Sequence, residues 1–322
     1  MNILFAGTPD PSARILDYLI AESSLNVIGV LTQPDKPQKR GKIVAESPVS
    51  NIAYHNKIKT FKPYYLNDKQ LVSEISALDI DILLVAAYGK ILPKWLLLLS
   101  NIFPVNIHYS LLPKYRGASP IQTSLLNGDE ITGVTFMKMS EGLDEGNIIK
   151  RFPLKIEHKH NKIMLENDLC SLAINNLTDV ISLIKSDKLN LERQDDSLAS
   201  FCSKIDKADS LVNFHSPAGD IFNKHRAYYE WPGTAFIYKN IRIKIGEMCV
   251  SDIDSSGNPG KILKFDTTGL YVNTDTKAIV ITYLQMPNKN TISSSDAFNA
   301  YKDYFNEWFN FGRSLLIRVK EV

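Results

Sequence analysis

Cysteine is scarce in this sequence, and no two cysteines have the spacing of a metal or redox motif. The three cysteines, Cys170, Cys202 and Cys249, lie far apart. Such spacing argues against a zinc site or a disulfide scaffold and is typical of a reducing compartment. We therefore expect no bound metal.

Long hydrophobic runs are also missing. The longest unbroken apolar run, Ile82 to Tyr88, is far too short to span a bilayer. The first residues, "MNILFAGTPD", lack the basic start and small-residue cleavage site of a signal peptide. We expect a cytoplasmic protein that does not contact membranes.

Charge of one sign is not in excess. The 37 Lys and Arg residues nearly balance the 35 Asp and Glu residues, for a net charge of +2. This balance excludes a strongly basic protein, so any binding of nucleic acid must depend on a local cluster of charges. With 322 residues and 44% hydrophobic residues, the chain is expected to form two globular domains.

The first half of the sequence alternates strand-like and helix-like segments. Buried strands are predicted where apolar residues are continuous, and helices where apolar residues recur on one face. This alternation favours an α/β fold with a mostly parallel, Rossmann-like sheet. The predicted strands span residues 2–7, 26–32, 80–87, 103–108 and 133–139, and the predicted helices span 12–22, 120–127 and 165–184.

The character of the sequence changes after residue 188. Residues 189–206 are polar and are interpreted as a linker. From residue 207 onward, short β-like pieces alternate with turn signals, which is typical of a small barrel or sandwich. The expected organisation is therefore a domain over 1–188, a linker over 189–206 and a β-domain over 207–322.

Asn106 and His108 stand at the carboxyl end of a predicted strand, in "VNIHYSLLPKYRG". Residues two apart in a strand share a face, so the two side chains are expected to lie together. Asp144 lies in a glycine-flanked turn after the strand over 133–139, and in a parallel sheet this turn would open on the same edge. An amide, an imidazole and a carboxylate suit a reaction at a carbonyl carbon. The alternative is a capping Asn, a half-buried His and an ordinary turn Asp.

Five motifs, in order along the chain, resemble the methionyl-tRNA formyltransferase family: "GTPD", "AAYGKILP", "NIHYSLLPKYRGASPIQ", "TGVTFMKMSEGLDEG" and "WPGTAF". The resemblance implies an N-terminal catalytic domain over 1–188 and a C-terminal OB-like β-barrel over 207–322 that binds tRNA. It implies transfer of a formyl group from 10-formyltetrahydrofolate to the amino group of methionyl initiator tRNA. The family's catalytic residues correspond to Asn106, His108 and Asp144.

The same resemblance predicts where the formyl donor binds. It implies folate contacts from the loop of Ser110, Leu111, Leu112 and Pro113, and from Ala87, Tyr88, Gly89 and Ile91. Taken alone, "SLLP" also suits a packed loop. No cofactor is expected to be tightly bound, because folate would act as a co-substrate.

The prediction of the formyl acceptor depends on a basic loop, "TQPDKPQKRGKIVAESPV". Its cations Lys36, Lys39, Arg40 and Lys42 could approach a phosphate backbone, although a charge cluster is often only a solvated loop. The pattern resembles the insertion with which the tRNA enzymes grip the acceptor stem.

The alternatives are a folate-dependent sugar-amine formyltransferase, which would not need this loop, and a binding module without turnover. "GTPD" is not a GxGxxG phosphate cradle, so a nicotinamide cofactor is not expected. We expect a monomer.

Tyr109 and the segment "HRAYYEWPG" each lead to a further prediction. Tyr109 stands where the family usually has a small residue, and its ring is expected to point away from Asn106 and His108. "HRAYYEWPG" places Tyr228, Tyr229 and Trp231 close together, where they could contact RNA or form part of a β-domain core.

Overall fold

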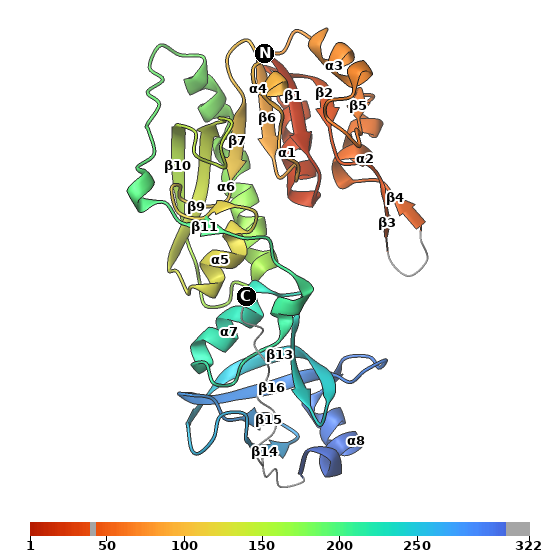
Figure 1. Ribbon diagram of the computed structural model, residues 1–322, viewed down its shortest axis with the longest axis vertical. Coiled ribbons are helices and arrows are strands. Elements are labelled where there is room, and N and C mark those ends of the chain that lie inside the picture. Colours follow the sequence, from red (N-terminus) through yellow and green to blue (C-terminus); the bar gives the residue numbers. More distant parts are fainter. Residues whose placement is uncertain (39–42, 307–322) are drawn as a thin grey trace. The chain divides into compact units, whose positions relative to one another are not determined.

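A computed structural model describes residues 1–38 and 43–306 of the chain, which form two compact units (Figure 1). The first unit comprises Met1–Ser124 and Asp129–Lys204. The second comprises Leu125–Gly128 and the described residues from Ile205 onward. Within the described ranges, no helix is long and apolar enough to cross a membrane.

A seven-stranded sheet forms the centre of the first unit, in the order β10-β9-β7-β6-β1-β2-β5. Its central strands are almost wholly buried because helices cover the sheet, which explains their continuous apolar runs. The strands of this sheet are β1 (Asn2–Gly7), β2 (Asn26–Leu31), β5 (Thr60–Phe61), β6 (Ile82–Ala86), β7 (Val105–His108), β9 (Ile131–Lys138) and β10 (Ile148–Lys155).

Helices of the first unit begin at side chains that suit helix N-termini. Ser47 and Asp68 accept hydrogen bonds from the backbone N–H groups of α2 and α3, and Asn161 does the same for α6. Arg14 and Tyr18 of α1 donate to or contact polar side chains of α6. The helices are α1 (Asp10–Ala21), α2 (Pro48–His55), α3 (Lys69–Ser76), α4 (Lys94–Leu97), α5 (Pro120–Leu126) and α6 (Lys162–Ile184).

The predicted elements of this half are confirmed, with ends that differ by a few residues, but one inference from them was wrong. The pairs β1-β2, β2-β5, β1-β6 and β6-β7 are parallel. By contrast, β9 is antiparallel to β7, and Lys138 at its carboxyl end lies opposite Val105. The end of β9 is therefore at the edge opposite His108. Because β9 is antiparallel to β7, it does not deliver the turn that carries Asp144 directly to His108. The chain after β9 must fold back for Asp144 to reach His108.

Two small pairings complete the first unit. Strands β3 (Lys36–Gln38) and β4 (Ile43–Ala45) of the basic segment pair as a hairpin that projects from the first unit (Figure 1). Two-residue strands β8 (Arg116–Gly117) and β11 (Phe201–Cys202) pair in parallel, which attaches the polar segment 189–206 to the chain just after β7.

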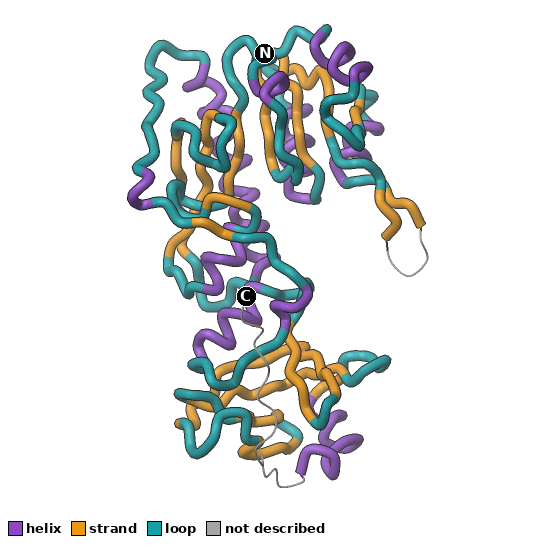
Figure 2. The backbone as a smooth tube through the Cα atoms, in the orientation of Figure 1, coloured by secondary structure: helices purple, strands orange, loops and turns teal. Residues whose placement is uncertain are grey.

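The second unit is built on an antiparallel sheet in the order β12-β13-β16-β15-β14, with a further strand beside β16. Figure 2 shows the strands of this unit in orange. Its inward residues form one apolar core that includes Ile243, Leu270 and Ile281, all fully buried. The expected β-rich C-terminal domain is confirmed. Its elements are α7 (Ala218–Ala227), β12 (Thr234–Tyr238), β13 (Ile241–Asp254), β14 (Ile262–Asp266), β15 (Gly269–Val272), β16 (Lys277–Gln285), β17 (Ile292–Ser293) and α8 (Ser294–Asn306).

Gly7 allows three elements of the first unit to approach one another closely. A Cβ atom at this position would lie 2.8 Å from Ser12 Cβ and 2.9 Å from the carbonyl oxygen of Ala86. We predict that Gly7→Ala destabilises the protein by about 1–3 kcal/mol, because neither backbone can move freely. Urea unfolding measures this effect. Gly219→Ala is the control, since a Cβ atom there meets nothing within 4 Å; equal stability losses in both variants would contradict the prediction.

Candidate active site

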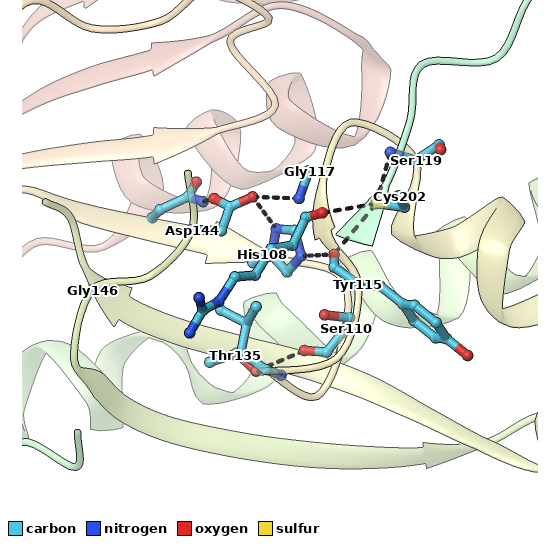
Figure 3. Close-up of polar contacts among 12 residues, drawn as sticks. His108, Ser110, Tyr115, Gly117, Ser119, Thr135, Asp144, Gly146 and Cys202 are labelled. Atoms are coloured by element: carbon cyan, nitrogen blue, oxygen red, sulfur yellow. Dashed lines mark hydrogen bonds and ion pairs between the residues drawn. The ribbon is translucent and has the colours of Figure 1, made fainter. Parts of the chain in front are cut away.

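Asn106 and His108 share one face of β7, as their spacing predicts, and both approach Asp144. Figure 3 shows the His108 ring beside the Asp144 carboxylate. Asn106 Nδ2 donates to Asp144 Oδ1 at 3.3 Å, and His108 Nδ1 lies 3.6 Å from Asp144 Oδ2. The structure therefore brings the three predicted catalytic side chains together, although Asp144 arrives from a loop that folds back from the far edge of the sheet.

The Asp144 carboxylate is largely shielded from water. Its side chain is 14% exposed, and its Oδ2 accepts a hydrogen bond from the Gly117 N–H at 2.8 Å. A carboxylate in such surroundings needs donors on both oxygens to remain charged. Gly117 and Asn106 supply these donors, and the imidazole of His108 supplies a third neighbour that can be cationic.

His108 is 6% exposed, and both of its ring nitrogens face acceptors. Nε2 lies 2.9 Å from the carbonyl oxygen of Tyr115. A carbonyl oxygen only accepts, so Nε2 carries a proton. A second proton on Nδ1 would point to the Asp144 carboxylate. Each ring nitrogen of His108 thus faces one acceptor, the Tyr115 carbonyl at Nε2 and the Asp144 carboxylate at Nδ1.

The loop that carries Asp144 is held in place by Gln194. Asp144 has a φ of +50°, a left-handed conformation that is uncommon for residues other than glycine. Gln194 Nε2 donates to the carbonyl oxygens of Asp144 and Gly146, both at 2.7 Å. The Gln194 carbonyl in turn accepts two hydrogen bonds from buried Arg116, at 3.0 and 2.9 Å. Sequence reasoning missed Gln194, which lies in an unremarkable polar stretch.

The segment after β7 is clamped by the chain around Ser200 and Cys202. The Arg116 N–H donates to the Ser200 carbonyl at 2.8 Å, and the Ala118 N–H donates to the Cys202 carbonyl at 3.1 Å. The Cys202 thiol also contacts the Tyr115 carbonyl that faces His108 (Figure 3). Part of the segment interpreted as a linker therefore supports the site.

The predicted folate loop is shaped from within by its own polar groups. Ser110 Oγ donates to the Lys114 carbonyl at 2.6 Å, and Thr135 Oγ1 donates to the Ser110 carbonyl at 2.6 Å. Ser110 and Leu112 are fully or almost fully buried, whereas Leu111 and Pro113 are half-buried. Of the four, Leu111 and Pro113 are the side chains with surface available to a ligand.

The predicted folate residues after β6 differ sharply in exposure. Ile91 is 91% exposed, and Ala87 is exposed with a φ of +48°. Tyr88 is 1% exposed, and burial raises its pKa to about 12. Its carbonyl oxygen accepts from Thr8 Oγ1 and Gln33 Nε2, each at 2.9 Å. Gly89 has a φ of +79°, which glycine adopts without strain.

The basic segment is partly described. Lys36 begins β3, whereas Lys39, Arg40 and Lys42 lie outside the described residues. At the base of the hairpin, Lys62 Nζ donates to Asp35 Oδ2 at 3.0 Å. The carboxylate of Asp35 is therefore paired with a lysine from outside the basic segment.

Tyr109 faces away from the reactive pair, as predicted. It lies against Cys170 of α6, and burial together with Cys170 holds the pKa of its phenol above the usual range. The bulky residue at this position therefore changes packing beneath the strand and leaves the Asn106–His108 face clear.

Comparison with known proteins shows the family of the chain. Residues 1–181 match the formyl transferase family, and residues 204–302 match the formyl transferase C-terminal domain. The chain belongs to the formyl transferase family.

Individual relatives refine the comparison. A protein of Legionella pneumophila (strain Corby) named methionyl-tRNA formyltransferase is 35% identical over 302 residues, which cover 94% of this chain and 96% of that one. A crystal structure of WlaRD, a sugar 3N-formyl transferase with dTDP and 5-N-formyl-THF, has a TM-score of 0.66 at 20% identity and covers 90% of this chain and 99% of that one. The structure of an N-formyltransferase from Helicobacter canadensis, in complex with folinic acid and dTDP-3-aminofucose, has a TM-score of 0.66 at 19% identity. The match covers 87% of this chain and 98% of that one. These two structures share the fold.

We predict that Gln194→Ala lowers kcat about tenfold, because two hydrogen bonds that fix the Asp144 loop are worth roughly 1–3 kcal/mol together. The KM for the formyl donor should change far less. Steady-state formyl transfer measures both constants. Asp195→Ala is the matched control, since Asp195 is the exposed neighbour of Gln194 in sequence and its carboxylate accepts hydrogen bonds from Ser197. Equal losses of kcat in the two variants would show that Gln194 does not act on Asp144.

Proposed function

We propose that the protein transfers the formyl group of 10-formyltetrahydrofolate to the amino group of methionyl initiator tRNA. The observation that carries this proposal is that Asn106 and His108 converge on the Asp144 carboxylate in a member of the formyl transferase family. Asn106 Nδ2 lies 3.3 Å and His108 Nδ1 lies 3.6 Å from the carboxylate oxygens. The relative named methionyl-tRNA formyltransferase supports the choice of acceptor, because it matches nearly the whole chain.

In this reaction the amino nitrogen of methionine attacks the formyl carbon. A new C–N bond forms, the carbonyl oxygen becomes an oxyanion, and the bond from the formyl carbon to N10 of the folate then breaks. One proton leaves the attacking amine, and one ends on N10. The main contribution expected of the protein is stabilisation of the oxyanion, which preorganised hydrogen-bond donors provide most effectively.

Asn106 and His108 are suited to stabilising that oxyanion. The Asn106 amide has two hydrogens, and Asp144 takes one of them. His108 is suited to an electrostatic role, since an imidazolium beside the oxyanion would be held by the Tyr115 carbonyl and by Asp144. Direct proton transfer through His108 Nε2 would first require it to leave the Tyr115 carbonyl. Asp144 therefore positions the Asn106 amide and the His108 ring.

The donor is expected to lie against Leu111, Pro113 and the exposed segment after β6. Leu111 and Pro113 have apolar surface, and the backbone around Ala87 and Gly89 presents polar groups for the edge of a pterin ring. The proposal includes no metal. Among the described residues, no group of three or more His, Cys, Asp or Glu side chains is arranged to hold one.

Two alternatives to this acceptor or activity remain testable. A sugar-amine formyltransferase would use the same formyl donor and catalytic side chains, and assay with a nucleotide-linked amino sugar measures that activity directly. A binding module without turnover would bind folate and form no product. The basic segment favours tRNA, because four cations close together in the sequence, Lys36, Lys39, Arg40 and Lys42, suit a phosphate backbone.

We expect Asn106→Ala and His108→Ala each to lower the rate of formyl transfer to methionyl-tRNA by about 100- to 1000-fold, as loss of one oxyanion donor does elsewhere. Single-turnover assays at saturating substrates measure this rate. Circular dichroism should show unchanged folding. A rate within threefold of the wild type in either variant would remove that residue from the mechanism.

Neutralising Lys39, Arg40 and Lys42 together is expected to raise the KM for methionyl-tRNA and to reduce its salt dependence, because fewer counterions are released on binding. The KM measured across a series of KCl concentrations tests this. Neutralising Lys150 and Lys155, two exposed lysines of β10, is the control. If the salt slope is the same in both variants, the hairpin does not hold tRNA.

A further inference from the structure

The second unit contains a pocket that the proposed reaction does not use. It has a volume of about 550 Å³, within the range of roughly 300–1,000 Å³ that is typical of small-molecule sites. It lies between the end of α7, the start of β12, the middle of β13 and the end of β16. The side chains that matter for its chemistry are those of His225, Tyr229, Lys244, Glu247, Tyr283 and Gln285.

His225 brings an unsatisfied polar atom into this pocket. The residue is 6% exposed, and its Nδ1 is 2.7 Å from Thr234 Oγ1. Its Nε2 is buried and has no hydrogen-bond partner among the described residues. The nearest carboxylate oxygen, on Glu247, is 3.9 Å away. A buried polar atom without a partner is costly, so its place in the wall of a pocket indicates that a ligand completes it.

Burial also fixes the charge state of this histidine. It lowers the pKa of His225 to about 4, so the ring is neutral at physiological pH. A neutral imidazole has one donor and one acceptor nitrogen, and the bond to Thr234 occupies one of them. His225 therefore offers a single directed hydrogen bond, which suits the edge of an uncharged polar ligand better than an anion.

An exposed aromatic side chain forms another part of the wall. Tyr283 of β16 is 45% exposed, although it lies in the middle of the sheet opposite Glu247 of β13. Gly246 precedes Glu247 in β13, at a shift in strand register between Ile245 and Glu247. A Cβ atom at Gly246 would lie 2.9 Å from Tyr283 Cβ and 2.8 Å from Thr291 Cγ2. Glycine is therefore required there for the tyrosine to keep its place.

The charges at the rim differ in sign. Lys244 is exposed and can meet a phosphate, whereas the exposed carboxylate of Glu247 can accept hydrogen bonds from an amino group. An exposed tyrosine face, an in-plane hydrogen bond from histidine, an acceptor for an amino group and a nearby cation together match a nucleotide. An amino-bearing base such as adenine, cytosine or guanine satisfies Glu247, whereas uracil has no amino group to donate.

We propose that this pocket binds an unpaired, amino-bearing nucleobase of the tRNA substrate, with Tyr283 stacking on the base, His225 and Glu247 contacting its edge, and Lys244 meeting the adjoining phosphate. The inference rests on the proposed function, because it takes tRNA as the substrate. It assigns a function to part of the aromatic segment around Tyr229, which the catalytic site leaves unused. A free mononucleotide has the same chemistry and is the competing source of the ligand.

The test compares the dissociation constant for tRNA of the full-length wild type with that of Tyr283→Ala. Stacking of one base on an aromatic side chain is worth about 5- to 100-fold in affinity, and Tyr283→Ala should weaken tRNA binding by that factor. Tyr283→Phe should restore most of the affinity, and kcat at saturating tRNA should stay within twofold. The control is Ile237→Ala, which removes another exposed side chain of the same sheet, 49% exposed and outside the pocket.

A second variant and a second ligand sharpen the test. His225→Gln keeps a polar group near the same place and should weaken tRNA binding in the same direction. AMP and UMP, titrated against the full-length protein by calorimetry, report on free nucleotides. Unchanged tRNA affinity in Tyr283→Ala overturns the proposal, whether or not AMP binds. If AMP binds in a manner that depends on Tyr283 while tRNA affinity is unchanged, the pocket belongs to a free nucleotide instead.

Failure of this inference is distinguishable from failure of the proposed function. A wild-type protein that forms formylmethionyl-tRNA, with pocket variants that bind tRNA normally, contradicts the pocket alone. A wild-type protein that forms no formylmethionyl-tRNA contradicts the proposed function, whatever the pocket variants do.

Discussion

The Asp144 carboxylate is a charge held away from water, and the surrounding site is arranged to keep it there. Gly117, Asn106 and His108 come from one short stretch of chain and approach its two oxygens at 2.8, 3.3 and 3.6 Å. Removing any of them would leave a shielded charge with fewer partners, which is expensive. This requirement fixes the end of β7, the turn after it and the orientation of the imidazole together.

The same requirement explains features that seem remote from chemistry. Asp144 has a left-handed conformation, and Gln194 holds the turn by donating to the carbonyl groups of Asp144 and Gly146. Gln194 is itself oriented by buried Arg116, which immediately precedes Gly117. The contacts therefore form a closed path from the carboxylate through Gln194 and Arg116 back to the Gly117 N–H. Such a path fixes Asp144 before a substrate arrives, and Asp144 in turn orients the Asn106 amide that we propose donates to the oxyanion.

Much of this fold could be predicted from the sequence, and the exceptions have physical causes. Continuous apolar runs identified β1 and β6 because strands covered on both faces leave no polar positions. Strand direction was not predictable for β9, since β9 is paired on both sides and buried, and an antiparallel strand in that position carries the same apolar pattern as a parallel one. Asn106, His108 and Asp144 were found because polar residues at strand ends and glycine-flanked turns stand out. Gln194 was missed because its role depends on a contact across 50 residues of chain, which no local pattern reveals.

The central claim is that the Asp144 charge makes the site able to transfer a formyl group to methionyl-tRNA. The most direct measurement is the single-turnover rate of formyl transfer by Asp144→Asn and by the wild type, with donor binding measured in parallel. The asparagine is nearly the same shape but has no charge, and its amide group would face the donors of Gly117 or Asn106. We expect a rate lower by about 100-fold or more in Asp144→Asn, with donor affinity nearly unchanged. Equal rates would show that formyl transfer does not need the Asp144 charge and would contradict this mechanism.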